Sequence, residues 1–328
     1  MFIAIRFVLS VALLASAVPG SLGSQESVFR SGARTVAVYV TVSDESGSLV
    51  PDLTREDFEV YDNGKRQTIT LFESGVQPIT VVLMLDRSGS MVGNFRLVRS
   101  AAEQFVSQLR PGDKARIGSF ANRIQVDPRE FTSSQRDLIE ILRTDLQEPG
   151  PTPLWNAVNV GITALQHQEG RRVVLVFTDG IDRPMNSHSI SLNEVMKNAE
   201  EHDVMVFAIG LATRSYFANR GGRGRGRGPT VGGIGQPGGI GAPPEFEQPD
   251  PGLPRIALAT GGGYFELTSA ANLSATFNRV ADELHRQYSL GFTPPSFDGK
   301  THKLEVKLRK PGLKARARRT YVARKDVL

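Results

Sequence analysis

Three short stretches of the sequence place oxygen-bearing side chains next to apolar runs. Those side chains are, in chain order, Asp86, Ser88, Ser90, Thr152 and Asp179. The first three form a D-x-S-x-S pattern, the threonine lies in the stretch PGPTPL, and the last aspartate is followed by glycine. Carboxylate and hydroxyl oxygens are the hard ligands that Mg²⁺ and Mn²⁺ prefer, whereas Zn²⁺ favours nitrogen and sulfur. If the three stretches meet in the folded chain, they can hold such a cation.

Each stretch also has a structural explanation when it is taken alone. Ser88 or Ser90 can cap a following helix, and Asp86 can accept hydrogen bonds from the amides of a turn. Thr152 can cap a helix whose first residue is proline, and Asp179 with the glycine after it is a common turn. The chemistry therefore depends on whether the fold brings the stretches together.

The elements that must position these side chains alternate between residues 78 and 286. Continuous apolar runs, typical of strands buried on both faces, lie at 79–85, 115–120, 173–178, 204–209 and 264–267. Apolar residues with helical spacing lie between and after them: Leu97, Val98, Ala101, Phe105, Leu109; Leu138, Ile141, Leu142; Leu154, Val158, Ile162, Leu165; Val195, Ala199; Leu273, Phe277, Val280, Leu284. This α/β pattern predicts a doubly wound, mainly parallel sheet flanked by helices, in which ligands bind at the carboxyl ends of the strands.

The two ends of the chain predict a small antiparallel β module around this domain. Residues 34–76 show alternating valines and an Asp-Asn-Gly hairpin signal. Within residues 287–325, Leu304, Val306 and Leu308 alternate with charged side chains before a Pro-Gly turn. Both pieces are too short to fold separately. We expect strands 36–42 and 58–72 to pack with 304–308 and 315–322, so that the α/β domain is inserted within the module.

Together, Asp86, Ser88, Ser90, Thr152 and Asp179 resemble the metal-ion-dependent adhesion site of von Willebrand factor type A domains in order and in spacing. The resemblance covers residues 78–286. It implies that the serines, and the threonine when a ligand is bound, coordinate the metal directly, while both aspartates act mainly through water. It further implies a Mg²⁺ or Mn²⁺ ion that accepts an Asp or Glu from a protein partner.

The same resemblance implies a conformational response. In the family, the last helix, here predicted around Leu273–Leu284, slides when the threonine moves onto the metal. Loop residues Arg87, Asn94 and Asp182 are expected to contribute contacts with the partner. The outer regions, including LTREDFEV and QYSLGF, resemble a group of exported bacterial proteins related to von Willebrand factor type A, whose role is poorly defined.

The first residues predict export. Arg6 precedes an apolar run at 7–14 and small residues at 15–17, as in a secretory signal peptide. We expect this peptide to comprise residues 1–17 and to extend at most to about residue 23. The run is shorter than the ~20 residues of a membrane span, with an uncleaved anchor as the alternative. The chain has no cysteine, which excludes disulfides and thiolate metal sites. We expect a periplasmic or extracellular protein.

A Gly- and Pro-rich stretch at 219–252 is expected to be a flexible insertion, because its composition does not support a packed element. An RNA-binding Arg-Gly tract is the alternative, but few arginines alternate with glycine there and no aromatic residues interleave. The overall charge is nearly balanced, with 39 Lys and Arg against 34 Asp and Glu, so nucleic-acid binding is not expected.

Two further function classes stay open beside a protein-binding module. A metal-dependent hydrolase lacks support, because there is no G-x-S-x-G motif and the five histidines show no ligand spacing. We therefore expect no enzyme activity. Binding of a polyanion or cell-surface polymer is the other alternative, through the basic carboxyl end at Lys314, Arg316, Arg318 and Arg319 and through the Arg-Gly stretch. Those residues otherwise form the solvated face of an edge strand. An intracellular chelatase-type module is disfavoured by the signal peptide and by the lack of a nucleotide-binding loop.

Overall fold

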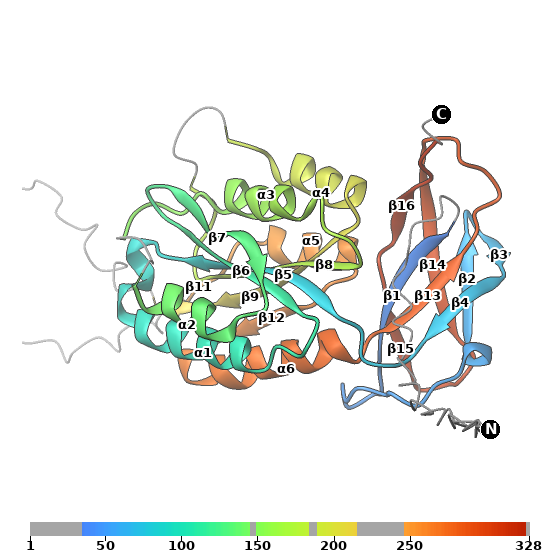
Figure 1. The fold of residues 1–328 in the computed structure, drawn as a ribbon, viewed down its shortest axis with the longest axis horizontal. Helices are drawn as coiled ribbons and strands as arrows, with labels where there is room; N and C mark the ends of the chain where they lie inside the picture. The colour runs from blue at the N-terminus through green and yellow to red at the C-terminus, as the bar shows by residue number, and fades with distance from the viewer. Residues whose placement is uncertain (1–34, 145–148, 184–188, 215–245, 326–328) are drawn as a thin grey trace, which may run out of the picture. The chain divides into compact units, whose positions relative to one another are not determined.

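The computed structural model describes residues 35–144, 149–183, 189–214 and 246–325 (Figure 1). The predicted signal peptide lies outside the described residues, as does the part of the predicted insertion from 219 to 245. In the described ranges, no helix has both the length and the apolar composition needed to cross a membrane.

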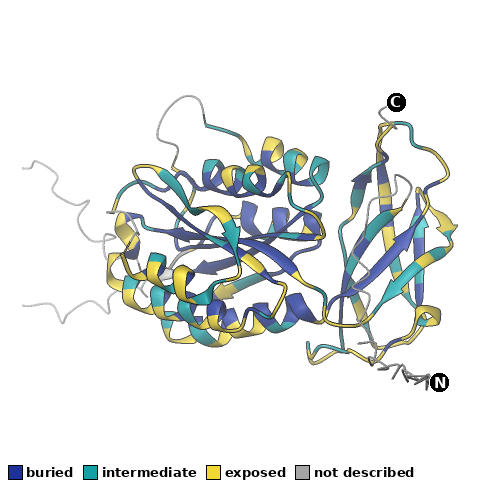
Figure 2. Cartoon of the chain, in the orientation of Figure 1, coloured by how far each residue is buried: buried dark blue, intermediate teal, exposed yellow. Residues whose placement is uncertain are grey.

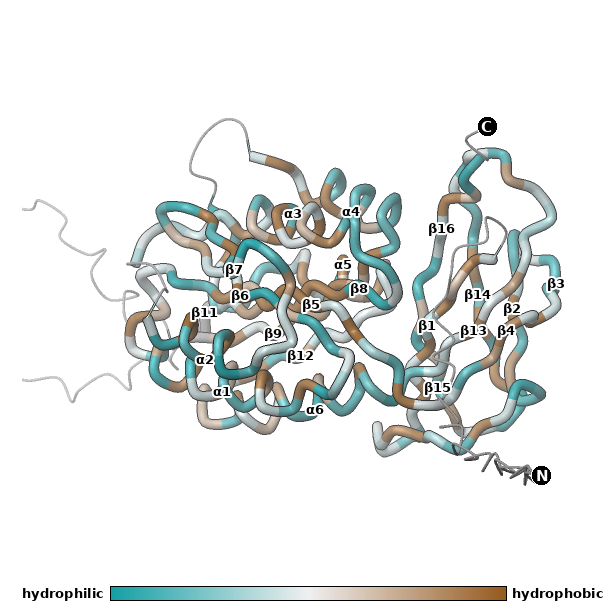
Figure 3. The backbone as a smooth tube through the Cα atoms, in the orientation of Figure 1, coloured by the Kyte–Doolittle hydropathy of each residue, from teal (hydrophilic) through white to brown (hydrophobic). Residues whose placement is uncertain are grey.

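A six-stranded sheet forms the centre of the α/β domain, in the order β12-β9-β8-β5-β6-β7. All neighbouring pairs run parallel except β6 and β7, which are antiparallel. The strands are β5 (Ile79–Asp86), β6 (Lys114–Phe120), β7 (Ile124–Thr132), β8 (Arg171–Thr178), β9 (Val204–Leu211) and β12 (Tyr264–Leu267). Every residue of β5 and β9 is buried, which explains their continuous apolar sequences (Figures 2 and 3).

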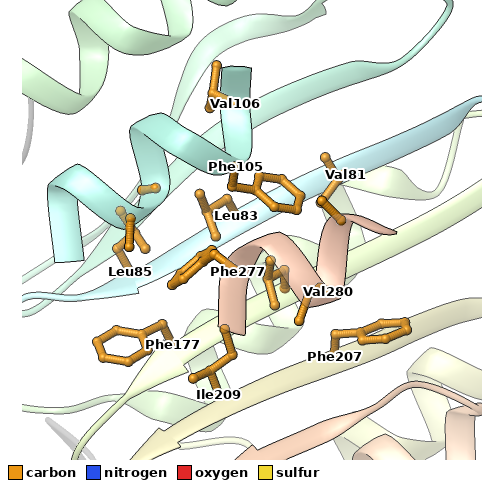
Figure 4. Packing of buried hydrophobic residues seen from close by; sticks show 14 of the residues in the cluster. Val81, Leu83, Leu85, Phe105, Val106, Phe177, Phe207, Ile209, Phe277 and Val280 are labelled. Atoms are coloured by element: carbon orange, nitrogen blue, oxygen red, sulfur yellow. The ribbon is translucent and has the colours of Figure 1, made fainter. Parts of the chain in front are cut away.

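Helices cover both faces of this sheet (Figure 1). They are α1 (Phe95–Ser107), α2 (Gln135–Thr144), α3 (Leu154–Leu165), α4 (Leu192–Glu201), α5 (Gly252–Thr260) and α6 (Leu273–His285). Helices α1, α2 and α6 pack against one face, and α3, α4 and α5 against the other. Alternate residues of β5 enter the two cores, Leu83 on one side and Met84 on the other. In the first core, the ring centroid of Phe277 lies 6.1 Å from that of Phe105 (Figure 4).

The chain ends form two antiparallel four-stranded sheets with a shared apolar core. One has the order β15-β1-β13-β4 and the other β16-β14-β2-β3. Their strands are β1 (Val36–Ser43), β4 (Ile69–Glu73), β13 (Tyr288–Phe292) and β15 (Lys314–Arg316), then β2 (Phe58–Asp62), β3 (Lys65–Gln67), β14 (Thr301–Leu308) and β16 (Thr320–Val322). Because β1 pairs with β15 and β2 with β14, the early and late parts of the chain fold as one module.

The predicted fold class is confirmed, and the differences are local. Strand β7 and helix α5 were not predicted, and Tyr288–Phe292 was not assigned as a strand although it is the central partner of β1 and β4. Leu97 was placed on the buried face of its helix, but its side chain is 47% exposed. The predicted helical residues Leu273, Phe277, Val280 and Leu284 are all buried.

The predicted insertion extends too far at its carboxyl end. Strand β11 (Phe246–Glu247) pairs with β10 (Thr213–Arg214), Asp250 is 8% exposed, and α5 begins at Gly252. Residues 246–252 are therefore part of the packed domain. Proline and glycine predicted a loop here, but Pro254 lies in the first turn of α5, where proline is tolerated.

The basic carboxyl end is not simply a solvated strand face. Arg316 forms an ion pair with Glu283 of α6, whose side chain is 4% exposed. Arg318 is 14% exposed and forms an ion pair with Asp203, which directly precedes β9. The prediction of an exposed face is wrong for these two arginines, because both lie against the α/β domain.

Candidate metal centre

The strand order brings two of the predicted stretches together. β5 and β8 are parallel neighbours, so their carboxyl ends meet at one edge of the sheet. Asp86 is the last residue of β5 and Asp179 directly follows β8. Their side chains are 0% and 1% exposed. Two carboxylates are therefore held at this edge away from bulk water.

Hydrogen bonds fix the orientation of the Asp86 carboxylate. Its Oδ1 accepts from the backbone N–H of Ser88 at 2.7 Å, and its Oδ2 accepts from Oγ1 of Thr178 at 2.5 Å. Burial raises the pKa of this carboxyl, and the hydrogen bonds from Thr178 and Ser88 act against that increase. Thr178 was not among the predicted site residues. The only signal for it was its place beside Asp179.

The Oγ atom of Ser90 lies within hydrogen-bond distance of two other oxygens, one from each of two loops. The Oγ atoms of Ser88 and Ser90 are 3.1 Å apart, and Oγ of Ser90 donates to Oδ1 of Asp179 at 2.8 Å. Ser88 is 2% exposed, whereas Ser90 is exposed to solvent. The cluster therefore begins at the surface and continues inward.

The loop that carries Thr152 joins the other two through its backbone. The N–H of Gly89 donates to the carbonyl of Gly150 at 3.0 Å, and the N–H of Arg183 donates to the carbonyl of Thr152 at 2.8 Å. A methyl group added at Gly180 would lie 3.5 Å from Oγ1 of Thr152. All five predicted residues are thus brought to one edge of the sheet.

Hydrogen bonds of Asp250 and Asp182 hold the loop after β8, which carries Asp179. The sequence did not predict a role for Asp250. Asp250 accepts from the N–H of Asp182 at 3.0 Å and from that of Gly252 at 2.8 Å, while its own N–H donates to the carbonyl of Gly180 at 3.3 Å. Asp182 accepts from the N–H of Trp155, at the start of α3, at 3.2 Å. Burial raises the pKa of Asp182, and the nearby Asp250 adds to that increase. The Asp182 carboxylate thus accepts a hydrogen bond at the start of α3. Its expected contact with a partner stays a prediction.

The donor set fits a hard divalent cation. Neighbouring oxygens around octahedral Mg²⁺, at bond lengths of about 2.0–2.1 Å, lie about 3 Å apart, and the Ser88–Ser90 spacing of 3.1 Å matches this value. Among the residues that the structure describes, no group of three or more His, Cys, Asp or Glu side chains could hold a metal. A cation at this edge would therefore depend on hydroxyl oxygens as well as carboxylates.

Part of this chain matches a known domain family. The model of the von Willebrand factor type A domain matches residues 80–220, a range that includes all three site loops. Similar solved structures include an aerotolerance-related membrane protein from Bacteroides fragilis NCTC 9343 with multiple mutations to serines. Its identity is 18%, over 62% of this chain and 99% of that chain, with a TM-score of 0.43.

Two other similar structures are from a bacterium and a mussel. The von Willebrand factor type A structure from Catenulispora acidiphila has 11% identity over 90% of this chain and 75% of that chain, with a TM-score of 0.47. Proximal thread matrix protein 1 from the mussel byssus, with a zinc-occupied metal-ion-dependent adhesion site, has 16% identity and a TM-score of 0.47. The match covers 68% of this chain and 50% of the mussel chain. By its match to the family model, this chain is a von Willebrand factor type A domain protein.

Proposed function

We propose that this protein is an exported, metal-dependent protein-binding module. Asp86, Ser88, Ser90, Thr152 and Asp179 hold one Mg²⁺ or Mn²⁺ ion at the carboxyl edge of the sheet. A bound ion of this kind supplies a Lewis-acidic position that accepts a carboxylate oxygen of an Asp or Glu from the partner. No catalytic role is proposed for these residues.

The observation that carries the proposal is the cluster of Ser88 Oγ, Ser90 Oγ and Asp179 Oδ1, with distances of 3.1 and 2.8 Å. Two of these three oxygens are neutral. They add no negative charge that would repel an anionic ligand, and the exposed Ser90 leaves the cluster open to a partner. Asp86 is turned toward Ser88 and Thr178, where it positions the loop.

A selection experiment tests the function without a known partner. Random heptapeptides displayed on phage are captured on the immobilised chain in Mg²⁺ and eluted with EDTA. We expect Asp and Glu to be enriched in the eluted peptides relative to the starting library. Thr152→Ala should bind Mg²⁺ but give no acidic enrichment, because the threonine contributes when the ligand is bound. Thr163→Ala, an exposed threonine on α3, is the matched control.

The outcomes separate the parts of the proposal. Eluted peptides without acidic enrichment would contradict carboxylate binding at the metal. If Thr152→Ala and the unmodified chain enrich Asp and Glu equally in the eluted peptides, Thr152 takes no part in binding the ligand. Fractionation of cells that produce the full chain, with mass spectrometry of the amino terminus, tests export: an unprocessed protein in the cytoplasm would contradict it.

A further inference from the structure

Three large apolar side chains near the candidate metal centre are exposed. Val92 is 54% exposed, Leu97 47% and Ile181 42%. Val92 belongs to the 3-10 helix Gly89–Asn94 that follows the first site loop, Leu97 to the first turns of α1, and Ile181 to the loop after β8. Exposed apolar residues are ordinary when they are scattered singly, so their grouping around one site needs an explanation.

Val92 and Ile181 lie close in the chain to two residues of the oxygen cluster. Ser90 Oγ lies 2.8 Å from Asp179 Oδ1, and each apolar residue follows one of these two at a distance of two positions in the chain. Two residues of chain span at most about 7 Å, so the Cα atom of Val92 lies within that distance of the Cα atom of Ser90. The Cα atom of Ile181 likewise lies within that distance of the Cα atom of Asp179. A ligand segment that reaches Ser90 therefore passes close to both exposed residues.

Ile181 is exposed although the backbone around it is fixed. On one side the carbonyl of Gly180 accepts from the N–H of Asp250 at 3.3 Å, and on the other the N–H of Asp182 donates to the Asp250 carboxylate at 3.0 Å. Val92 directly follows Met91, which is 0% exposed and whose N–H donates to the carbonyl of Ser88. Both apolar side chains are thus held at the surface by ordered backbone.

The charge around the cluster favours an acidic ligand. The site carboxylates Asp86 and Asp179 are buried, and Asp250 is nearly so. Arg96, in the first turn of α1, is exposed. The guanidinium of Arg87 lies 3.5 Å from the ring centroid of Phe95, where the ring holds it beside the first loop. Three carboxylates near the cluster are therefore buried and Asp182 is half-buried, whereas Arg96 is exposed.

We propose that the apolar rim, formed by Val92 and Ile181, binds an extended segment of a protein partner in which an apolar residue lies two positions from the Asp or Glu. In an extended chain, side chains two positions apart are about 7 Å apart and point the same way. One segment can therefore place its carboxylate at the cluster and its apolar side chain on the rim. This inference rests on the proposed metal-dependent function.

The heptapeptides eluted in the selection provide the probe. We expect Leu, Ile, Val or Phe to be enriched two positions from the acidic residue. The most enriched peptide is then synthesised, together with one version in which this apolar residue is serine and another in which the acid is glutamine. Replacing the apolar residue should weaken binding to the chain in Mg²⁺ by about tenfold, the loss expected when one branched side chain is no longer buried.

The double variant Val92→Ser/Ile181→Ser should bind the apolar and serine peptides equally, with unchanged Mg²⁺ affinity. Val76→Ser is the matched control, because Val76 is also a 54% exposed valine but precedes β5, at the opposite end of that strand. It should keep the tenfold preference.

The two hypotheses fail in different ways. Acidic enrichment that depends on Mg²⁺, without any apolar preference at the second position, would overturn the apolar rim and leave the metal-dependent function standing. An apolar preference that survives in Val92→Ser/Ile181→Ser would also overturn the rim. Peptide binding that is equal in Mg²⁺ and in EDTA would overturn the proposed function itself.

Discussion

At the scale of single residues, Asp250 connects the loop after β8, here called the metal loop because it carries Asp179, to the rest of the domain. Its carboxylate accepts from Asp182 and Gly252, and its N–H donates to Gly180. None of these contacts places Asp250 in the oxygen cluster itself. Its effect on a metal would act through the loop that carries Asp179.

We predict that Asp250→Ala weakens Mg²⁺ binding severalfold. The substitution leaves two backbone N–H groups without their acceptor, which costs about 1–3 kcal/mol for a buried group and frees the loop after β8. Calorimetric titration and urea unfolding of the full chain measure the two effects. Asp137→Ala, at a 50% exposed position in α2, is the control and should change neither. If Asp250→Ala lowers stability but leaves Mg²⁺ affinity unchanged, Asp250 plays no part in positioning the metal loop.

The sequence was sufficient to predict that Asp86, Thr152 and Asp179 lie at strand ends or helix starts, because local pattern reveals such positions. The family resemblance selected the five residues as a metal site, which stays a prediction. The sequence was not sufficient for Asp250, which contacts a residue 68 positions away. Asp182 was predicted near the site, but its capping of α3 depends on a contact across 27 positions. Long-range hydrogen bonds of this kind leave no local spacing to recognise.

At the scale of elements, the two terminal segments stabilise each other. Val38 and Val40 of β1 are 0% exposed, and they share a core with Leu304 of β14 and Tyr321 of β16. Strand β1 also pairs directly with β15. Without the late strands, one face of the early ones would be exposed to water.

Deleting residues 300–328 should therefore destabilise the first strands, although they are far away in sequence. We predict that the amide hydrogens of β1 and β2 exchange faster in the truncated chain, by hydrogen exchange with mass spectrometry. Replacing 219–245, which the sequence predicts to be a flexible insertion, with a short Gly-Ser linker is the control, since changing the length of such an insertion costs little free energy. Equally slow exchange of β1 in the truncated and full chains would show that the module does not depend on its late strands.

The buried strands were predicted because β5, β8 and β9 are continuous apolar runs, a signal set by burial on both faces. Strand β7 was not predicted because it lies at the edge of the sheet and its sequence, IQVDPREFT, contains a proline and three charged residues. An edge strand has partners on one side only and tolerates such residues. Helix α5 was not predicted because glycine and proline residues lie around its first turn.

At the scale of the whole molecule, the basic carboxyl end contacts acidic groups of the α/β domain. Asp203 forms ion pairs with Arg318, Arg324 and Arg172, and Glu283 pairs with Arg316. The side chains of Arg318 and Arg316 are therefore partnered within the chain. Their charge gives less support to polyanion binding than the sequence alone suggested.

These ion pairs predict a pH dependence of stability. Burial acts to raise the pKa of Asp203, but Arg318 and Arg324 outweigh it, so the pKa lies below its usual value of 3.8. A carboxyl whose pKa is lower in the folded than in the unfolded chain stabilises the fold at pH values above its unfolded-state pKa. This contribution is lost as the pH falls through its folded-state pKa. The affected window is therefore below about pH 4.

Asp203→Asn should lower the unfolding free energy at pH 7 by less than about 1 kcal/mol, because the carboxylate is 38% exposed and solvent screens it. Asparagine suits the positive φ of 50° at this position as aspartate does, so the backbone is preserved. Urea unfolding at pH 7 and pH 3 should show the difference from the unmodified chain shrinking at the lower pH. A difference that is equal at both would mean that the charge of Asp203 is not its source.

The most direct test of the account is calorimetric titration of Mg²⁺ into the chain without its predicted signal peptide. The oxygen cluster predicts one site, which is lost in Asp86→Ala and in Ser88→Ala/Ser90→Ala while circular dichroism shows the fold retained. Ser100→Ala, an exposed serine on α1, should bind as the unmodified chain does. Unchanged Mg²⁺ binding in both the Asp86 and the double serine variants would contradict the metal centre.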